Sequence, residues 1–174
     1  MAETIVNKIA ESGIITLNLE QFLPTDEEWM ILDIKPFLFK EMILKEKDFR
    51  LALDQTDWSV YADKVVSITC TADAIIPMWA YMLLATKLQP HAKVVLVGNE
   101  TDTEEQMLLR NIEQIDVAEY TDKRVVIKGC GHKAIPEAAF AAITAKLLPA
   151  VKSLMYGEPC STVPVFKKKK NATE

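Results

Sequence analysis

The stretch Lys64-Val65-Val66-Ser67-Ile68-Thr69-Cys70, followed by Thr71-Ala72-Asp73, decides the fold class of this chain. A short β-branched apolar run that ends in a turn before a helical segment is typical of a strand in a β–α–β unit. The same rhythm recurs at residues 94–97 and 125–127, and these runs are as continuously apolar as strands buried on both faces of a parallel sheet. The sequence therefore predicts an α/β fold, with the strands that end at Cys70, Val97 and Cys130 as parallel neighbours in one sheet.

Helical apolar spacing separates these strands. Helices are expected at residues 75–88 and 104–115, and a third begins at Pro136. Its apolar residues recur at intervals of three and four and extend the expected helix to Tyr156: Phe140, Ile143, Leu147, Val151 and Leu154. This spacing places these residues on one face of a single helix.

The first sixty residues form a less regular α/β segment. It contains expected helices at residues 3–11 and 45–53 and strands at 14–19 and 29–34. No internal repeat or low-complexity linker that would divide the chain is evident, and we expect none. We therefore expect a single domain over residues 1–166, a mainly parallel sheet flanked by helices in Rossmann-like β–α–β units, and a disordered basic tail at 167–174.

The amino-acid composition argues against several classes of function. The 174 residues are 49% hydrophobic and 26% charged, with a net charge of -5, which argues against nucleic-acid binding. The start of the chain lacks the pattern of a secretory signal, and the longest uncharged stretch, residues 74–86, is too short to cross a bilayer. A cytoplasmic protein without membrane association is expected. Three cysteines then indicate free thiols, a metal site or a reactive thiol.

Two cysteines follow the ends of predicted strands, where open α/β sheets bind ligands. Cys70 precedes Asp73, which is the expected N-cap of the next helix and the nearest carboxylate ligand. Cys130 lies in the glycine-flanked loop before Pro136, and His132 in this loop is a further candidate ligand or base. Helix N-termini favour thiolates, the form that binds metals. Each cysteine taken alone is more typical of core packing, and only the recurrence of cysteines after two strands makes a functional site equally plausible.

Cys160 raises a problem of distance. A straight helix from Pro136 to Tyr156 would be about 30 Å long and would carry the chain to the opposite edge of the sheet. Cys160 joins the other cysteines only if Pro149 breaks the helix and turns the chain round, or if a second subunit in a homo-oligomer supplies it. The sequence leaves both routes open.

Several catalytic signatures are absent. The chain has no dinucleotide-binding or phosphate-binding glycine loop, no Gly-x-Ser-x-Gly elbow and no Cys-x-x-Cys pair. Nucleotide enzymes and hydrolases are therefore disfavoured, and the sequence does not decide whether the protein is an enzyme.

Five segments together resemble the uncharacterised bacterial family labelled domain of unknown function 2480. The similarity runs over nearly the whole chain, at residues 14–22, 44–50, 69–75, 128–130 and 155–161. The resemblance implies no assigned activity. Genes of this family lie beside those of iron–sulfur cluster assembly, so the resemblance implies a metal or sulfur role and iron–sulfur assembly proteins as partners.

The resemblance also implies a set of ligands. The family's recurring cysteines match Cys70, Cys130 and Cys160, and its acidic residue matches Asp73, whereas His132 departs from the family pattern. Three thiolates and one carboxylate suit zinc and can also hold an iron–sulfur cluster. The leading hypothesis is a metal-binding accessory protein for zinc, iron or an iron–sulfur cluster. The alternatives are a persulfide sulfur carrier that uses Cys130 and a protein-binding module without chemistry.

Overall fold

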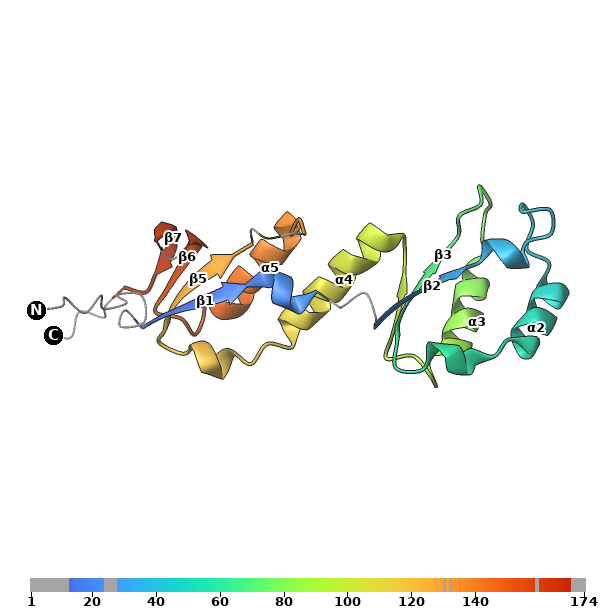
Figure 1. The fold of residues 1–174 in the computed structure, drawn as a ribbon, viewed down its shortest axis with the longest axis horizontal. Coiled ribbons are helices and arrows are strands. Elements are labelled where there is room, and N and C mark those ends of the chain that lie inside the picture. Colours follow the sequence, from blue (N-terminus) through green and yellow to red (C-terminus); the bar gives the residue numbers. More distant parts are fainter. Residues whose placement is uncertain (1–12, 24–27, 130, 132, 159, 170–174) are drawn as a thin grey trace, which may run out of the picture. The chain divides into compact units, whose positions relative to one another are not determined.

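The computed structural model describes residues 13–23, 28–129, 131, 133–158 and 160–169. These residues form an α/β structure with two sheets, one entirely parallel and one mixed (Figure 1). The chain divides into two compact units. Unit 1 comprises Met1–Leu23 and Met107–Glu174, and unit 2 comprises Pro24–Gln106. Whether they constitute the single domain expected over residues 1–166 stays a prediction.

Unit 2 is built on the parallel sheet β2-β3-β4, whose strands are Trp29–Asp33, Val65–Thr69 and Val94–Val97. Two helices, α2 (Glu46–Gln55) and α3 (Met78–Leu88), connect the strands. They lie on one side of the strands (Figure 1). The core of the unit joins both helices to the sheet through buried residues: Leu32, Val66, Ile68, Phe49, Leu53, Ala80, Leu84 and Leu88. Short 3-10 turns at Lys35–Phe37 (η3) and Trp58–Tyr61 (η4) complete the unit.

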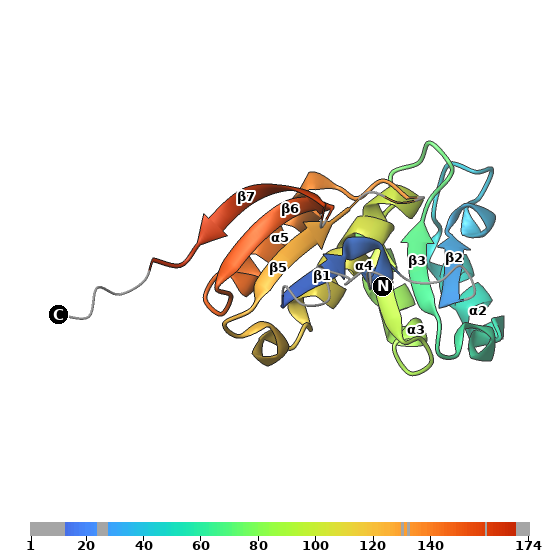
Figure 2. The same cartoon turned by 60° about the vertical axis from the view of Figure 1, so that its left-hand side comes forward.

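Unit 1 is built on the mixed sheet β1-β5-β6-β7. Its strands are Ile14–Asn18, Arg124–Lys128, Ser153–Glu158 and Ser161–Lys167, and only β7 is antiparallel to its neighbour. Helix α5 (Glu137–Leu147) connects β5 to β6 and lies behind the sheet in Figure 2. The buried core of this unit draws on the sheet, on α5 and on helix α4 (Glu100–Glu113): Leu17, Val125, Ile127, Leu154, Ile143, Leu147, Leu108 and Ile112. Turns η1 (Leu19–Phe22) and η5 (Val117–Tyr120) flank these elements.

The two units repeat the same order of strand, 3-10 turn, helix, 3-10 turn, strand, helix and strand. Many residues of the second half of unit 2 recur in unit 1 at one constant offset. Identical pairs include Asp57 and Asp116, Tyr61 and Tyr120, Asp63 and Asp122, Lys64 and Lys123, Pro77 and Pro136, Ala80 and Ala139, Leu88 and Leu147, Pro90 and Pro149, and Gly98 and Gly157. The expectation that the chain contains no internal repeat is therefore wrong.

Matched residues also have matched roles. Asp57 and Asp116 each cap a 3-10 turn by accepting a backbone N–H two residues ahead. Asp63 and Asp122 both have positive φ, 59° and 55°, and their N–H groups bond to the matched carbonyls of His91 and Ala150. The two units are thus two copies of one fold. In the sequence, unit 2 is inserted into unit 1, between Leu23 and Met107.

Two expectations about these strands and helices are wrong in part. Strands β3 and β4 are parallel neighbours as predicted, but β5 belongs to the other sheet and pairs with β1 and β6. The C-terminal helix ends at Leu147, before Pro149, because proline has no N–H to continue the helical ladder. Val151 then lies in the turn and Leu154 in β6.

Three elements expected in the first sixty residues are confirmed, whereas strand β7 (Ser161–Lys167) was not expected. Strands occur at Ile14–Asn18 and Trp29–Asp33, and a helix occurs at Glu46–Gln55. The helix expected at residues 3–11 lies outside the described residues. At the other end, β7 reaches Lys167 and the N–H of Lys168 bonds to the Lys152 carbonyl, while residues 170–174 lie outside. Within the described ranges, no helix is long and apolar enough to cross a membrane.

Candidate functional site

Cys160 is exposed at the tip of the β6–β7 hairpin. Glu158 pairs with Ser161, so a two-residue connection joins the strands. Because the chain turns back after Pro149 and β6 runs parallel to β5, this tip lies at the carboxyl ends of the strands. That edge is where α/β sheets bind ligands.

Gly157 allows the backbone to form the tight turn of the hairpin. Its φ of +121° favours glycine, and a Cβ at this position would lie 2.6 Å from the Ser161 carbonyl oxygen. Any other residue would therefore open the turn that carries Cys160.

The loop after β5 is held against its neighbours by two glycines. A Cβ on Gly129 would overlap the Phe140 ring, and one on Gly131 would overlap the Glu20 carboxylate. Glu20, which follows β1, also accepts the backbone N–H of Lys133 at 2.8 Å. This loop thus lies close against the end of β1. Cys130 and His132 belong to the same loop but lie outside the described residues.

An ion pair joins the ends of β5 and β6. Lys128 Nζ lies 2.8 Å from Glu158 Oε1, and the two side chains are 31% and 40% exposed. Their strands are adjacent, with Ile127 opposite Tyr156. The loop that follows β5 and the hairpin tip therefore begin from neighbouring positions.

Cys70 has a different environment in unit 2. Its side chain is partly buried against the core of that unit, and its thiol donates to the Ala72 carbonyl at 3.6 Å. Burial raises the pKa of the nearby Tyr81 phenol, and its electrostatic interaction with Cys70 raises it further. This packing is typical of a structural cysteine.

Asp73 is not a helix cap, contrary to expectation. Helix α3 begins at Met78, its N-cap is Pro77, and Asp73 lies exposed in the preceding loop. There it lines a shallow pocket of about 420 Å³ with apolar side chains that include Ile43 and Ile75.

Asp33 at the end of β2 holds the loop that follows Cys70. Its carboxylate accepts the Thr71 hydroxyl and the backbone N–H groups of Thr71 and Lys35, at 3.1 Å and 2.9 Å. Partial burial works to raise the pKa of Asp33, but these hydrogen bonds and the charge of Lys35 outweigh it, so the pKa lies below its usual value. The carboxylate is therefore charged at neutral pH and fixes the loop.

The two strand-end cysteines do not occupy matched positions in the repeat. At the constant offset, Cys70 matches Gly129 and Cys130 matches Thr71. Cys70 directly follows its strand, whereas Cys130 and Cys160 each come two residues after the ends of β5 and β6. Cys70 and Cys130 follow strands of different sheets, β3 and β5, so the expectation that they follow strands of one sheet is wrong. The distance between their sulfurs stays a prediction, because Cys130 lies outside the described residues.

Sequence reasoning missed several residues at these strand ends. Glu20, Glu158 and Gly157 were not considered, although the rule that ligands bind at carboxyl ends of strands also applies to the residues that follow β1 and β6. In the part of the chain that the structure describes, no three His, Cys, Asp or Glu side chains gather as metal ligands would.

The fold and these strand ends define a duplicated α/β protein with loops that carry thiols and carboxylates. The family model described as a protein of unknown function (DUF2480) matches residues 3–168, and the chain belongs to this family. No curated protein and no solved structure matches the chain.

Proposed function

We propose that this protein is a metal-binding accessory protein whose ligand site lies at the strand ends of unit 1. One observation carries the proposal: Cys160 follows β6 by two residues, exactly as Cys130 follows the adjacent parallel strand β5. In Rossmann-like proteins, ligands bind beyond the carboxyl ends of the strands of such β–α–β units.

The distances allow the two thiols to meet. Adjacent strands lie about 4.8 Å apart, and two residues extend at most about 7 Å from each strand end. Zinc or iron bound at about 2.3 Å by both sulfurs requires no greater reach. Cys130 and Cys160 are therefore the primary ligands in this proposal.

The donor types suit the expected metals. Thiolates favour zinc, iron and iron–sulfur clusters, and His132 or a carboxylate at this edge would complete the coordination. Cys70 and Asp73 belong to the other unit, and the proposal does not require them. Zinc, iron or cluster binding would serve metal handling or iron–sulfur cluster assembly.

Metal analysis of anaerobically purified protein, with its visible absorption spectrum, tests this proposal. Wild type should carry stoichiometric metal, and Cys130→Ser and Cys160→Ser should each lose most of it. Cys70→Ser is the matched control and should keep its metal. A metal-free wild type would contradict the proposal, and a mass gain of one sulfur atom on Cys130 would favour the persulfide carrier instead.

An exposed apolar surface on unit 2 favours a second function, that of a protein-binding module. Ile75 is 95% exposed and lines the pocket beside Asp73 together with Met42 and Ile43. Met78, three residues after Ile75 in the sequence, is 72% exposed. Exposed methionines are common at adaptable binding surfaces. We define these four residues as the apolar surface of unit 2.

Photo-crosslinking in cells tests this second function. A photoreactive residue at position 75 should give one dominant adduct, and Met42→Ser should weaken it. The same residue at the exposed position Gln89 is the control. Equal labelling from positions 75 and 89 would remove the apolar surface of unit 2 from consideration.

A further inference from the structure

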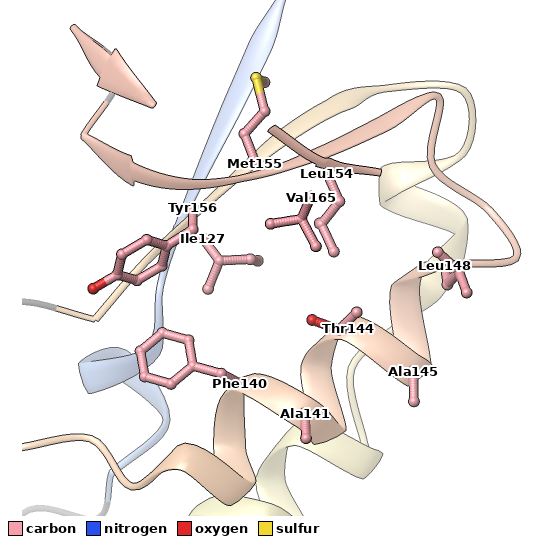
Figure 3. Close-up of a pocket in the computed structure, with 10 residues that line it drawn as sticks. All are labelled: Ile127, Phe140, Ala141, Thr144, Ala145, Leu148, Leu154, Met155, Tyr156 and Val165. Carbon is pink, nitrogen blue, oxygen red and sulfur yellow. The ribbon is translucent and has the colours of Figure 1, made fainter. Parts of the chain in front are cut away.

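An apolar groove of about 730 Å³ runs along α5 in unit 1. Ile127, Leu154 and Val165 point into it from the strands (Figure 3). The rings of Phe140 and Tyr156 pack edge to face, 5.6 Å apart, at one end of it. The volume falls in the range of specific binding sites.

The groove exists because β7 extends the sheet and because helix α5 has small side chains along the groove. Ala141, Thr144 and Ala145 line the groove from α5, at the i, i+3 and i+4 positions along one side of the helix. In α3, Met82 occupies the position matched to Ala141 and Thr86 the position matched to Ala145. Both residues are larger than alanine. Small residues allow a second helix to approach closely.

Large apolar side chains lie exposed along this groove. Val165 is 56% exposed, Tyr156 is 47% exposed, and Leu148 at the end of α5 is 40% exposed. Covering such contiguous apolar surface is favourable, so this side of unit 1 is suited to a partner with an apolar face.

The sequence before β1 has a complementary apolar stripe. Ala2, Ile5, Val6, Ile9 and Ala10 recur at the i, i+3, i+4, i+7 and i+8 spacing of one helix face. The structure adds an independent observation at Gly13, whose φ of +62° is the left-handed conformation that terminates helices. Both features are compatible with the helix expected from the sequence before β1.

The expected helix would be too far from the β7 side of the groove in its own chain. Ile14 lies in register with Arg124, Ser153 and Lys167, so three strand spacings, about 14 Å, separate the start of β1 from β7. Residues 11–13 span at most about 10 Å, and the turn at Gly13 shortens that reach. A helix beside α5 must also rise above the sheet.

We propose that the groove beside α5 receives residues 2–11 of a second copy of this chain, so that two copies exchange their N-terminal helices. Ten helical residues measure about 15 Å, and the groove from Phe140 to Leu148 spans about 12 Å of α5. The exchange is two-fold symmetric, because each copy supplies one helix and one groove. It is independent of the proposed metal site.

Disulfide trapping in the full-length chain tests the exchange. In a background with all three cysteines changed to serine, checked by circular dichroism for native helix content, Ile5→Cys and Ala145→Cys are made as separate variants. Their mixture should form a disulfide-linked dimer on oxidation. Lys8→Cys lies on the polar face of the expected helix. Mixed with Ala145→Cys, it should form at least tenfold less disulfide-linked dimer.

Oligomeric state provides the second measurement. Wild type should sediment as a dimer, and Ala145→Glu should raise the dimer dissociation constant at least tenfold. Thr86→Glu, at the matched position on α3, should leave the dissociation constant unchanged. Three results would overturn the proposal: a wild type that stays monomeric throughout the concentration series, a cross-link formed only within one chain carrying both cysteines, or uptake of a fluorescent fatty acid by the groove of a monomer.

Discussion

At the scale of single residues, Gly157 determines whether Cys160 can occupy its hairpin tip. Gly157→Ala places a methyl group 2.6 Å from the Ser161 carbonyl at a φ of +121°. We expect a loss of about 1–3 kcal/mol in the free energy of unfolding, measured by urea titration. Gly13→Ala is the control, because its Cβ meets nothing within 4 Å and only its φ of +62° is unfavourable. An equal or larger loss at Gly13 would contradict this account of the hairpin.

Asp33 should make the stability of unit 2 depend on pH. Its folded-state pKa lies below the unfolded value of about 3.9, so its contribution is complete above that value and disappears as pH falls through the folded-state pKa. Asp33→Asn should therefore lower the free energy of unfolding by about 1 kcal/mol at pH 7. The difference from wild type should shrink as the pH is lowered below 3.9. A difference that grows on acidification would show that the hydrogen bonds to Thr71 and Lys35 do not favour the charged form.

Residue chemistry located the strand-end cysteines but could not define their surroundings. The apolar runs placed Cys70 and Cys130 after strands because β-branched residues before a turn carry a strong local signal. Whether a thiol packs against a core, as Cys70 does, depends on side chains distant in the sequence. Asp73 was mistaken for a cap because acidic residues favour both helix starts and loops.

At the scale of elements, α5 must approach its sheet closely. Ala139 is fully buried within the unit 1 core, as is its counterpart Ala80 in unit 2. Ala139→Leu should overpack this contact and lower the free energy of unfolding by about 1–3 kcal/mol, measured by thermal and urea denaturation. Ala138→Leu on the exposed side of α5 is the control and should change it by less than about 0.5 kcal/mol. Similar effects at both positions would contradict the packing.

The strand and helix types of unit 2 were predictable, whereas the C-terminal elements of unit 1 were not. Leu147, Val151 and Leu154 recur at helical spacing because the end of α5, the turn and β6 all contribute to the same core. Apolar spacing alone cannot distinguish that arrangement from one long helix. The pairing of β5 with β1 was likewise invisible, because a local pattern does not specify which distant strand lies beside it.

At the scale of the whole molecule, each unit has its own hydrophobic core. Leu88 is buried in unit 2, and its counterpart Leu147 is buried in unit 1. Leu88→Ala and Leu147→Ala should each lower the free energy of unfolding by about 2–5 kcal/mol. Hydrogen exchange followed by mass spectrometry should show lost protection mainly in the substituted unit. Equal loss across residues 28–106 and 107–158 for both variants would show that the cores unfold as one.

The duplication escaped sequence reasoning for a physical reason. Matched residues are mostly caps, turn residues and buried positions, spread between exposed positions that are free to differ. Unit 1 is also interrupted, so its first strand lies on the other side of the whole of unit 2. The common strand order and register align the two copies and make the matched residues evident.

The interrupted path of unit 1 has a consequence for synthesis on the ribosome. Strand β1 emerges early, but its partner β5 follows only after roughly one hundred further residues, which take about 5–20 s to translate. During that interval unit 2 can complete its three-stranded sheet, while Ile15 and Leu17 of the nascent β1 have no core to enter. Vectorial synthesis therefore allows the inserted copy to mature first, and it leaves the apolar side chains of β1 exposed until β5 has been made.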